Sequence, residues 1–161
     1  MNIIPREEMN LPVIEIDNDV YFVCFIIEML RRGMEDTCGN IVRKIGLEKI
    51  RHLLEFADVY HCLTPEQVCG ELEEEFKLTR GNHPVLFDEP ERIPSDLKIG
   101  KQYAEIVCIC HPDDLALGIY NVMSSHITDE ISDFRTATFY SSLDWLIDSY
   151  KAGEMVSTLL E

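Results

Sequence analysis

The helical spacing of the apolar residues is the feature that most constrains the fold. In the stretch VYFVCFIIEMLRR, Val20, Val23 and Ile27 recur three or four positions apart, which is the period of one face of an α-helix. Asp17 is one of three cap-forming residues before this stretch, and Gly33 follows it. The sequence therefore predicts a helix that begins near Asp17 and ends near Gly33.

The stretch DVYHCLTPEQVCGELEEEF contains the joint between two helices. Thr64 is an N-cap residue, Pro65 stands at the first helical position, and Gln67 completes a capping box. We therefore predict a helix that begins here and ends near Leu78. The glutamates within residues 71–75 are expected to face solvent.

The same periodicity, with caps and helix stops, predicts further helices. The segment ending AEIVCIC contains enough β-branched residues to form a strand instead. The segment RTATFYSS is expected to be a loop or a short strand. We expect a mainly α protein, a multi-helix bundle of about seven helices in two packed helical units. The other predicted helices cover about 37–45, 47–60, 97–110, 112–134 and 142–153.

Residues 80–96, RGNHPVLFDEPERIPSD, interrupt the helical pattern. They contain three prolines and a glycine, so no regular element is expected to persist there. We interpret the segment as a proline-rich loop or linker, whose order the sequence does not decide. It separates an N-terminal helical unit, residues 1–79, from a C-terminal acidic helical unit, residues 97–161.

The net charge of this 161-residue chain is −16 at pH 7, and most of it lies after residue 63. Phosphate contacts need Lys and Arg, so direct binding of nucleic acid is disfavoured. A protein with a basic surface is the expected partner, although charge of this size also keeps a protein soluble. Residues 31–51, here named the basic shoulder, are net positive. They could bind the acidic half of a second copy, so a homo-oligomer is also possible.

Membrane insertion is not expected from the apolar pattern. The longest apolar run, residues 20–27, is far shorter than the roughly 20 residues that cross a bilayer. The start, MNIIPREEMN, has no basic region followed by an apolar stretch. We therefore expect no membrane partner and a cytoplasmic location, in which the six cysteines stay reduced.

Four features follow one another between residues 17 and 77: a helix with an Ile-Glu pair, a glycine after an apolar residue, a helix ending in Tyr-His, and a last helix. They are Ile27-Glu28, Ile45-Gly46, Tyr60-His61 and the helix from Thr64. In this order and spacing the chain resembles a short helical bacterial family of unknown function. Genes of that family often lie beside genes for toxin-like proteins, some resembling ADP-ribosyltransferases. The resemblance implies an accessory or antitoxin role by association.

Histidine and cysteine occur close together at two places. His61 and Cys62 are adjacent, which rarely suits one tetrahedral zinc ion, and no Cys-x-x-Cys spacing occurs. Cys108 and Cys110, which precede His111, would share a face in a strand but not in a helix. We expect no cofactor and no catalytic residue. The sequence does not decide whether either cluster has a chemical role.

One carboxylate group is an alternative metal site. His126, Glu130 and Asp133 are spaced i, i+4 and i+7, near one side of a predicted helix. Such spacing resembles part of a carboxylate metal site in a helical bundle, although no other helix offers the matching Glu-x-x-His. A small metal-dependent enzyme that uses these three residues is therefore an alternative function.

The preferred interpretation is a protein that binds another protein and has no active site. It would act as an inhibitor or antitoxin-type accessory by covering a basic surface of its partner. A nucleic-acid mimic that inhibits a DNA- or RNA-binding protein is a further alternative. The carboxylates expected to form the binding surface are Glu66, Glu71, Glu74, Glu75, Asp88, Glu89, Glu91, Asp129, Glu130 and Asp133.

Overall fold

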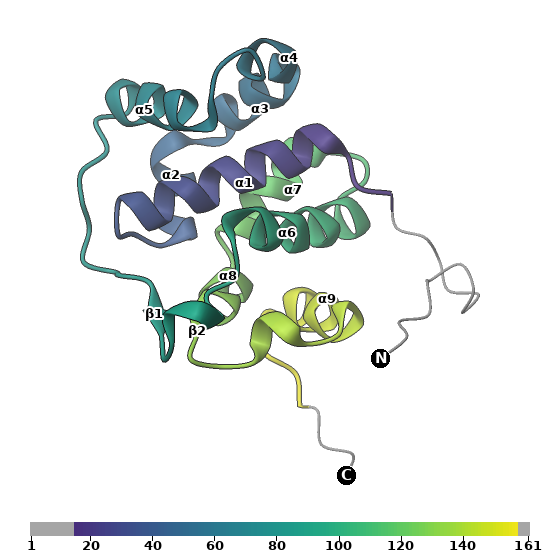
Figure 1. Cartoon of the computed structure of the whole chain (residues 1–161). Helices are drawn as coiled ribbons and strands as arrows, with labels where there is room; N and C mark the ends of the chain where they lie inside the picture. The colour runs from purple at the N-terminus through teal and green to yellow at the C-terminus, as the bar shows by residue number, and fades with distance from the viewer. Residues whose placement is uncertain (1–14, 158–161) are drawn as a thin grey trace, which may run out of the picture.

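The computed structural model describes residues 15–157, which form a bundle of helices with a very small sheet (Figure 1). The predicted mainly α fold is confirmed, but the described residues contain nine α-helices where about seven were expected. Every helix between residues 15 and 157 is too short or too polar to span a lipid bilayer. The helices are α1 (Asn18–Gly33), α2 (Cys38–Ile45), α3 (Leu47–Glu55), α4 (Ala57–Tyr60), α5 (Pro65–Glu75), α6 (Asp96–Cys110), α7 (Leu115–Met123), α8 (His126–Ile131) and α9 (Leu143–Ala152). The strands are β1 (Leu86–Phe87) and β2 (Asp133–Phe134), and short 3-10 turns cover Pro90–Arg92 and Thr138–Tyr140.

Side-chain caps start the first and fifth helices where the sequence predicted. The Asp17 carboxylate accepts hydrogen bonds from the backbone N–H groups of Asp19 at 2.9 Å and Val20 at 3.1 Å. In the predicted capping box, Thr64 Oγ1 accepts from the Gln67 N–H at 3.2 Å, and Gln67 Oε1 accepts from the Thr64 N–H at 2.8 Å. These bonds satisfy N–H groups that have no partner inside the helix.

Two serines divide the helix predicted over 112–134 into α7 and α8. Ser124 Oγ donates a hydrogen bond to the Tyr120 carbonyl at 2.6 Å, and Ser125 Oγ donates one to the Val122 carbonyl at 2.7 Å. Such side-chain bonds compete with the backbone bonds of a helix, so the single long helix is a wrong prediction. The helix predicted over 47–60 is likewise divided into α3 and α4.

The break between α3 and α4 occurs at Phe56. Its φ of −109° and ψ of 27° lie outside the helical range. The chain turns there, and α4 brings the Tyr60 hydroxyl to 3.1 Å from His52 Nδ1. The division of these two predicted helices explains why the described residues contain nine α-helices where about seven were predicted.

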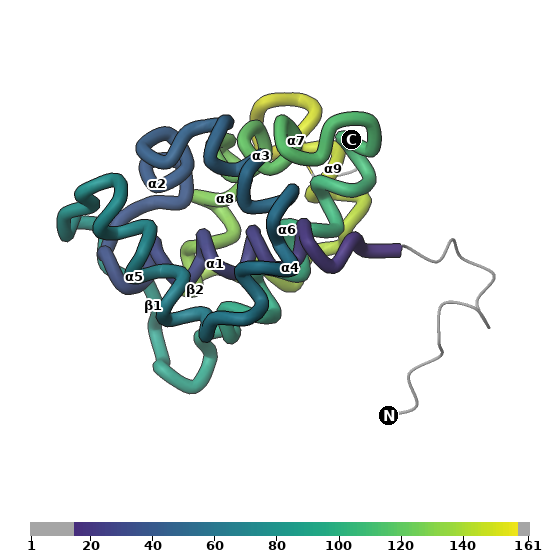
Figure 2. The backbone as a smooth tube through the Cα atoms, turned by 90° about the horizontal axis from the view of Figure 1, so that it is seen from above, coloured from purple at the N-terminus to yellow at the C-terminus, as the bar shows by residue number. Residues whose placement is uncertain are grey.

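Helices α1 and α6 pack side by side through the middle of the molecule (Figures 1 and 2). The segment AEIVCIC belongs to α6, so its strand alternative is wrong. Gly100 permits the close contact, because a Cβ atom there would lie 2.9 Å from Cα and 3.0 Å from N of Phe25. Residues from both predicted helical units enter one hydrophobic core along this contact.

Between α5 and β1 the chain runs along one side of the molecule (Figure 1), and the start of the proline-rich segment 80–96 is attached there to the turn after α1. The Gly81 N–H donates to the Met34 carbonyl at 2.7 Å, and the His83 N–H donates to the Glu35 carbonyl at 2.7 Å. A Cβ atom at Gly81 would lie 2.7 Å from that Glu35 oxygen, so the close approach requires glycine.

The end of this segment forms a regular element, contrary to prediction. Strand β1 pairs with β2 in parallel, with Leu86 opposite Asp133 and Phe87 opposite Phe134. The 3-10 turn Pro90–Arg92 follows β1. The pairing places the proline-rich segment beside the end of α8, at a corner that the sequence spacing did not indicate.

Candidate functional site

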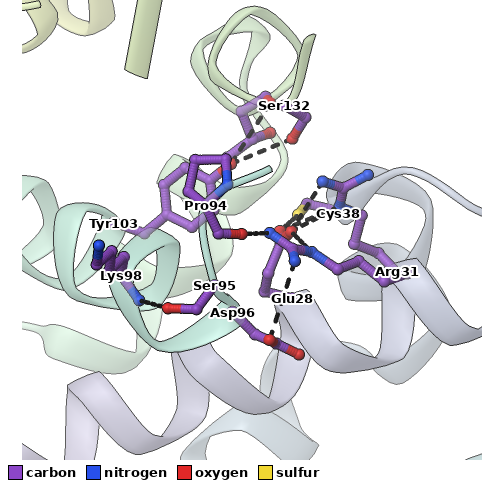
Figure 3. A network of polar contacts seen from close by, with 11 residues as sticks. Glu28, Arg31, Cys38, Pro94, Ser95, Asp96, Lys98, Tyr103 and Ser132 are labelled. Carbon is purple, nitrogen blue, oxygen red and sulfur yellow. Dashed lines mark hydrogen bonds and ion pairs between the residues drawn. The ribbon is translucent and has the colours of Figure 1, made fainter. Parts of the chain in front are cut away.

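A buried carboxylate lies at the centre of a polar network around α1 (Figure 3). Glu28 is fully buried, and its carboxylate accepts hydrogen bonds from Arg31 Nη2 at 2.8 Å and from Arg32 Nε at 2.6 Å. The Cys38 thiol donates another at 3.6 Å. A buried charge is stable when it is paired and hydrogen-bonded in this way, so Glu28 has a structural role.

The two arginines connect the network to other elements. Arg32 Nη2 donates to the Pro94 carbonyl at 2.8 Å, just before α6. The guanidinium groups of Arg31 and Arg32 also lie 5.7 Å and 5.3 Å from the ring centroid of Phe134 in β2. Burial alone would lower the pKa of Arg31, but the contact with Glu28 outweighs burial and raises it. Arg31 therefore remains charged.

Two neutral groups complete the network. Burial, reinforced by the nearby Glu28 carboxylate, raises the pKa of the Cys38 thiol, which stays a protonated donor. Burial also raises the pKa of Tyr103, whose hydroxyl lies 3.2 Å from Ser132 Oγ and donates to the Thr128 carbonyl at 3.5 Å. Figure 3 shows Tyr103 and Ser132 joining α6 to the end of α8.

A cavity of about 400 Å³ opens beside this network. Its wall comes from the end of α1, the turn between α1 and α2, the proline-rich segment and the corner between α8 and β2. This volume lies within the range of small-ligand sites. The lining includes the charged or ionisable side chains of Arg31, Asp36, His83, Asp129 and Asp133 and the apolar side chain of Leu86.

Asp36 is the most buried carboxylate of the cavity wall, with 3% of the residue exposed. It accepts hydrogen bonds from the Thr37 N–H at 2.8 Å, Asn40 Nδ2 at 2.7 Å and Lys44 Nζ at 3.0 Å. Burial alone would raise the pKa of Asp36, but these donors together hold it below its ordinary value. His83 Nδ1 lies 3.8 Å from the same carboxylate.

The other two carboxylates of the cavity differ in their partners. Asp133 accepts from Arg135 Nε at 2.9 Å and Nη2 at 2.8 Å, and this contact lowers the pKa of Asp133. Asp129 is exposed and forms no ion pair with any residue in the range 15–157. Asp129 is therefore the lining carboxylate whose charge remains available.

The predicted binding carboxylates lie in two groups. Pairing of β1 with β2 brings the proline-rich segment, with its exposed carboxylates, next to α8. Helix α5 lies at the other end of the same side of the molecule (Figure 1). The first group contains Asp88, Glu89, Glu91, Asp129, Glu130 and the partly buried Asp133, and the second contains Glu66, Glu71, Glu74 and Glu75.

Some of these carboxylates are already paired within the molecule. Glu75 forms an ion pair with Lys49 at 2.7 Å, and Glu89 forms one with Arg92 at 3.3 Å. Asp88, Glu91 and the glutamates at 66, 71, 74 and 130 are exposed and have no ion pair among the described residues. The unpaired members are the stronger candidates for binding a cation on another protein.

The alternative metal ligands are not arranged around one point. Helix α8 ends at Ile131, so Asp133 lies in β2 and contacts Arg135. His126 Nε2 is buried without a hydrogen-bond partner in the described structure. Across residues 15–157, no three His, Cys, Asp or Glu side chains are grouped so that they could hold a metal ion.

The histidine and cysteine clusters make structural contacts. The His61 ring lies 4.4 Å from the Phe22 ring, and the exposed Cys62 thiol donates to the Asp58 carbonyl at 3.6 Å. His111 Nε2 lies 2.6 Å from the Tyr150 hydroxyl. All six cysteines are free; Cys24, Cys38 and Cys69 are buried, whereas Cys108 and Cys110 are partly buried.

Several residues of the network and the cavity were not singled out from the sequence. From the sequence, Arg31 was considered only as part of the basic shoulder, and Asp36 was not named as a site residue. One signal was present: Glu28 interrupts an apolar stretch and has arginines three and four positions later, a spacing that pairs charges on a helix. The cavity itself had no local signal, because its wall comes from segments far apart in the chain.

The positions that carried the family resemblance have local structural roles. Gly46 has a φ of 87°, which favours glycine, and Glu28 holds the buried network. Lys49 Nζ lies 6.0 Å from the centroid of the Tyr60 ring.

Comparison with family models, curated proteins and solved structures found no match to this chain. The family resemblance therefore stays a prediction.

Proposed function

We propose that this protein is an acidic binding module that docks on a basic surface of another protein. The observation that carries the proposal is a group of exposed residues in and after β1 (Leu86, Phe87 and Asp88) and in the neighbouring α8 (Asp129 and Glu130), here named the corner surface; Leu86 and Asp129 line one cavity. Leu86 and Phe87 are 42% and 41% exposed, and the three carboxylates have no ion pair within the described range. Exposed apolar residues edged by unpaired charges are typical of a protein-binding site.

The charge distribution favours a separate basic protein over self-association. Several cations of the basic shoulder (residues 31–51) are already used inside the molecule: Arg31 and Arg32 by Glu28, and Lys44 by Asp36. Lys49 and Arg51 also have carboxylate partners. Little of the shoulder's positive charge is left to bind the corner surface of a second copy.

The mechanism would be occlusion. A partner with a basic site would be attracted by the net charge of −16, and its own site would be covered once the apolar pair and the carboxylates made contact. An inhibitor or antitoxin-type accessory acts in this way. The proposal does not require a reaction at the cavity.

Affinity capture from the native cell tests the proposal with two variants of equal charge change. One variant carries Asp129→Lys and Glu130→Lys in the corner surface; the other carries Glu71→Lys and Glu74→Lys on α5. All four residues are exposed and lack ion pairs among residues 15–157. A basic protein recovered with the wild type and the α5 variant, and lost from the corner variant, is the expected result.

The opposite pattern would overturn this assignment. Loss of the partner from the α5 variant alone would move the binding surface to α5. If both variants recover the basic protein as well as the wild type does, none of these four carboxylates belongs to the interface. Circular dichroism spectra of the two variants should match the wild type, because the changes lie on exposed positions.

A further inference from the structure

We propose that the cavity beside the corner surface binds one arginine side chain presented by the partner. This inference rests on the proposed function and adds the chemical group that the site recognises. The cavity of about 400 Å³ and the corner surface share Leu86 and Asp129, so a partner docked on the surface would have direct access to it.

The charge of the lining favours a cation. Three carboxylates, Asp36, Asp129 and Asp133, face the cavity, against the single guanidinium of Arg31 and the imidazole of His83. Arg31 is only 4% exposed and is held by Glu28 through Nε and Nη2. Lys44 and Arg135 already neutralise Asp36 and Asp133, so the attraction for an added cation comes mainly from Asp129, while Arg31, held by Glu28, offers little positive charge to an anion.

Among these carboxylates, Asp129 provides the attachment point. Asp36 is occupied by Lys44 and by neutral donors, and Asp133 is occupied by Arg135. Asp129 is exposed and has no cation partner within the described structure. A guanidinium can bond both oxygens of one carboxylate at once, which a lysine ammonium does not match in geometry.

The remaining wall suits the stem of an arginine. Pro84 and Leu86 provide apolar surface against which methylene groups can pack. Asn82 and Ser132 offer polar oxygens at the same wall. An arginine side chain combines an apolar stem with a planar cationic head, and so complements both parts of the cavity.

The test is a nuclear magnetic resonance titration of the full-length protein with N-acetyl-arginine methylamide. Backbone amide signals of Asn82, His83 and Ser132 should shift in a saturable way. The corresponding lysine derivative should bind more weakly, and inorganic phosphate should leave these signals in place. Asp129→Asn should weaken arginine binding roughly two- to fivefold, the range expected for loss of one exposed charge contact.

Asp148→Asn is the matched control, since Asp148 is an exposed carboxylate on α9, away from the cavity wall. It should leave the affinity for the arginine derivative unchanged. Three results would overturn the inference: no shift with the arginine derivative, preferential binding of phosphate, or equal affinity in Asp129→Asn and the wild type.

These results are distinguishable from failure of the proposed function. If the corner variant loses its protein partner but the arginine derivative does not bind, the surface is right and the cavity assignment is wrong. If the arginine derivative binds but the corner variant retains the partner, the proposed docking surface fails, and with it the partner-bound role of the cavity.

Discussion

At the residue scale, Glu28 shows how one buried charge can organise several elements. Its carboxylate is fully buried and accepts hydrogen bonds from Arg31, Arg32 and the thiol of Cys38. The same residue is part of the Ile-Glu pair on which the family resemblance rests. A position of this kind is constrained by packing and charge pairing, and its presence in a motif need not indicate catalysis.

Glu28→Ala should lower the free energy of unfolding by about 3–5 kcal/mol, because it leaves the buried Arg31 guanidinium without its partner. Urea denaturation followed by circular dichroism measures the change. Glu71→Ala, at an exposed position of α5, is the control and should change stability by less than about 0.5 kcal/mol. Equal effects of the two substitutions would contradict the structural role of Glu28.

Asp36 should make stability depend on acid pH. Its pKa is lower in the folded protein than in the unfolded chain, so it stabilises the fold above the ordinary carboxyl pKa of about 4. That contribution is lost as the pH falls through the lower, folded value. Asp36→Asn should therefore be clearly less stable than the wild type at pH 6, and the difference should shrink at pH 3. A stability difference that is the same at both pH values would contradict this account.

At the element scale, the contact between α1 and α6 decides how the two predicted helical units are joined. Gly100 brings the backbones together, and Arg32 bonds to Pro94 at the entrance to α6. The proline-rich segment is held by backbone bonds from Gly81 and His83 to the turn after α1. These tertiary contacts, and not helix propensity, position the wall of the cavity.

Two glycine substitutions should have opposite effects. In Gly100→Ala the new methyl group would meet the Phe25 backbone at 2.9 Å, and we expect a loss of about 1–2 kcal/mol from overpacking. In Gly70→Ala, on α5, nothing lies within 4 Å of the new Cβ, so the gain in helix propensity should stabilise by about 0.5–1 kcal/mol. Thermal unfolding of both variants measures the effects, and stabilisation by Gly100→Ala would contradict the close packing of α1 on α6.

At the scale of the whole molecule, the sequence predicted those features of the fold that depend on residues close together in the chain. The cap at Asp17, the capping box at Thr64 and Gln67, and the apolar face of α1 depend on residues within a few positions of one another. The serine break after α7 was missed, because side-chain bonds to the backbone compete there with good helical spacing.

The candidate site was predictable only in part. Asp129 was named from the sequence as a binding carboxylate, and it does line the cavity. Arg31, Asp36 and His83 come from other segments, and their meeting depends on the attachment of the proline-rich segment and on the pairing of β1 with β2. Contacts between residues so far apart leave no pattern in a single sequence, so the cavity could not be derived from it.

The central claim is that the corner surface binds a basic protein. The most direct measurement is the dissociation constant of the purified partner for the wild type, for Asp129→Lys with Glu130→Lys, and for Glu71→Lys with Glu74→Lys, by isothermal titration calorimetry. We predict that the corner variant binds about tenfold or more weakly, which corresponds to about 1.4 kcal/mol, while the α5 variant changes far less. Equal weakening by both variants would show that only net charge matters, and unchanged affinity of the corner variant would contradict the account.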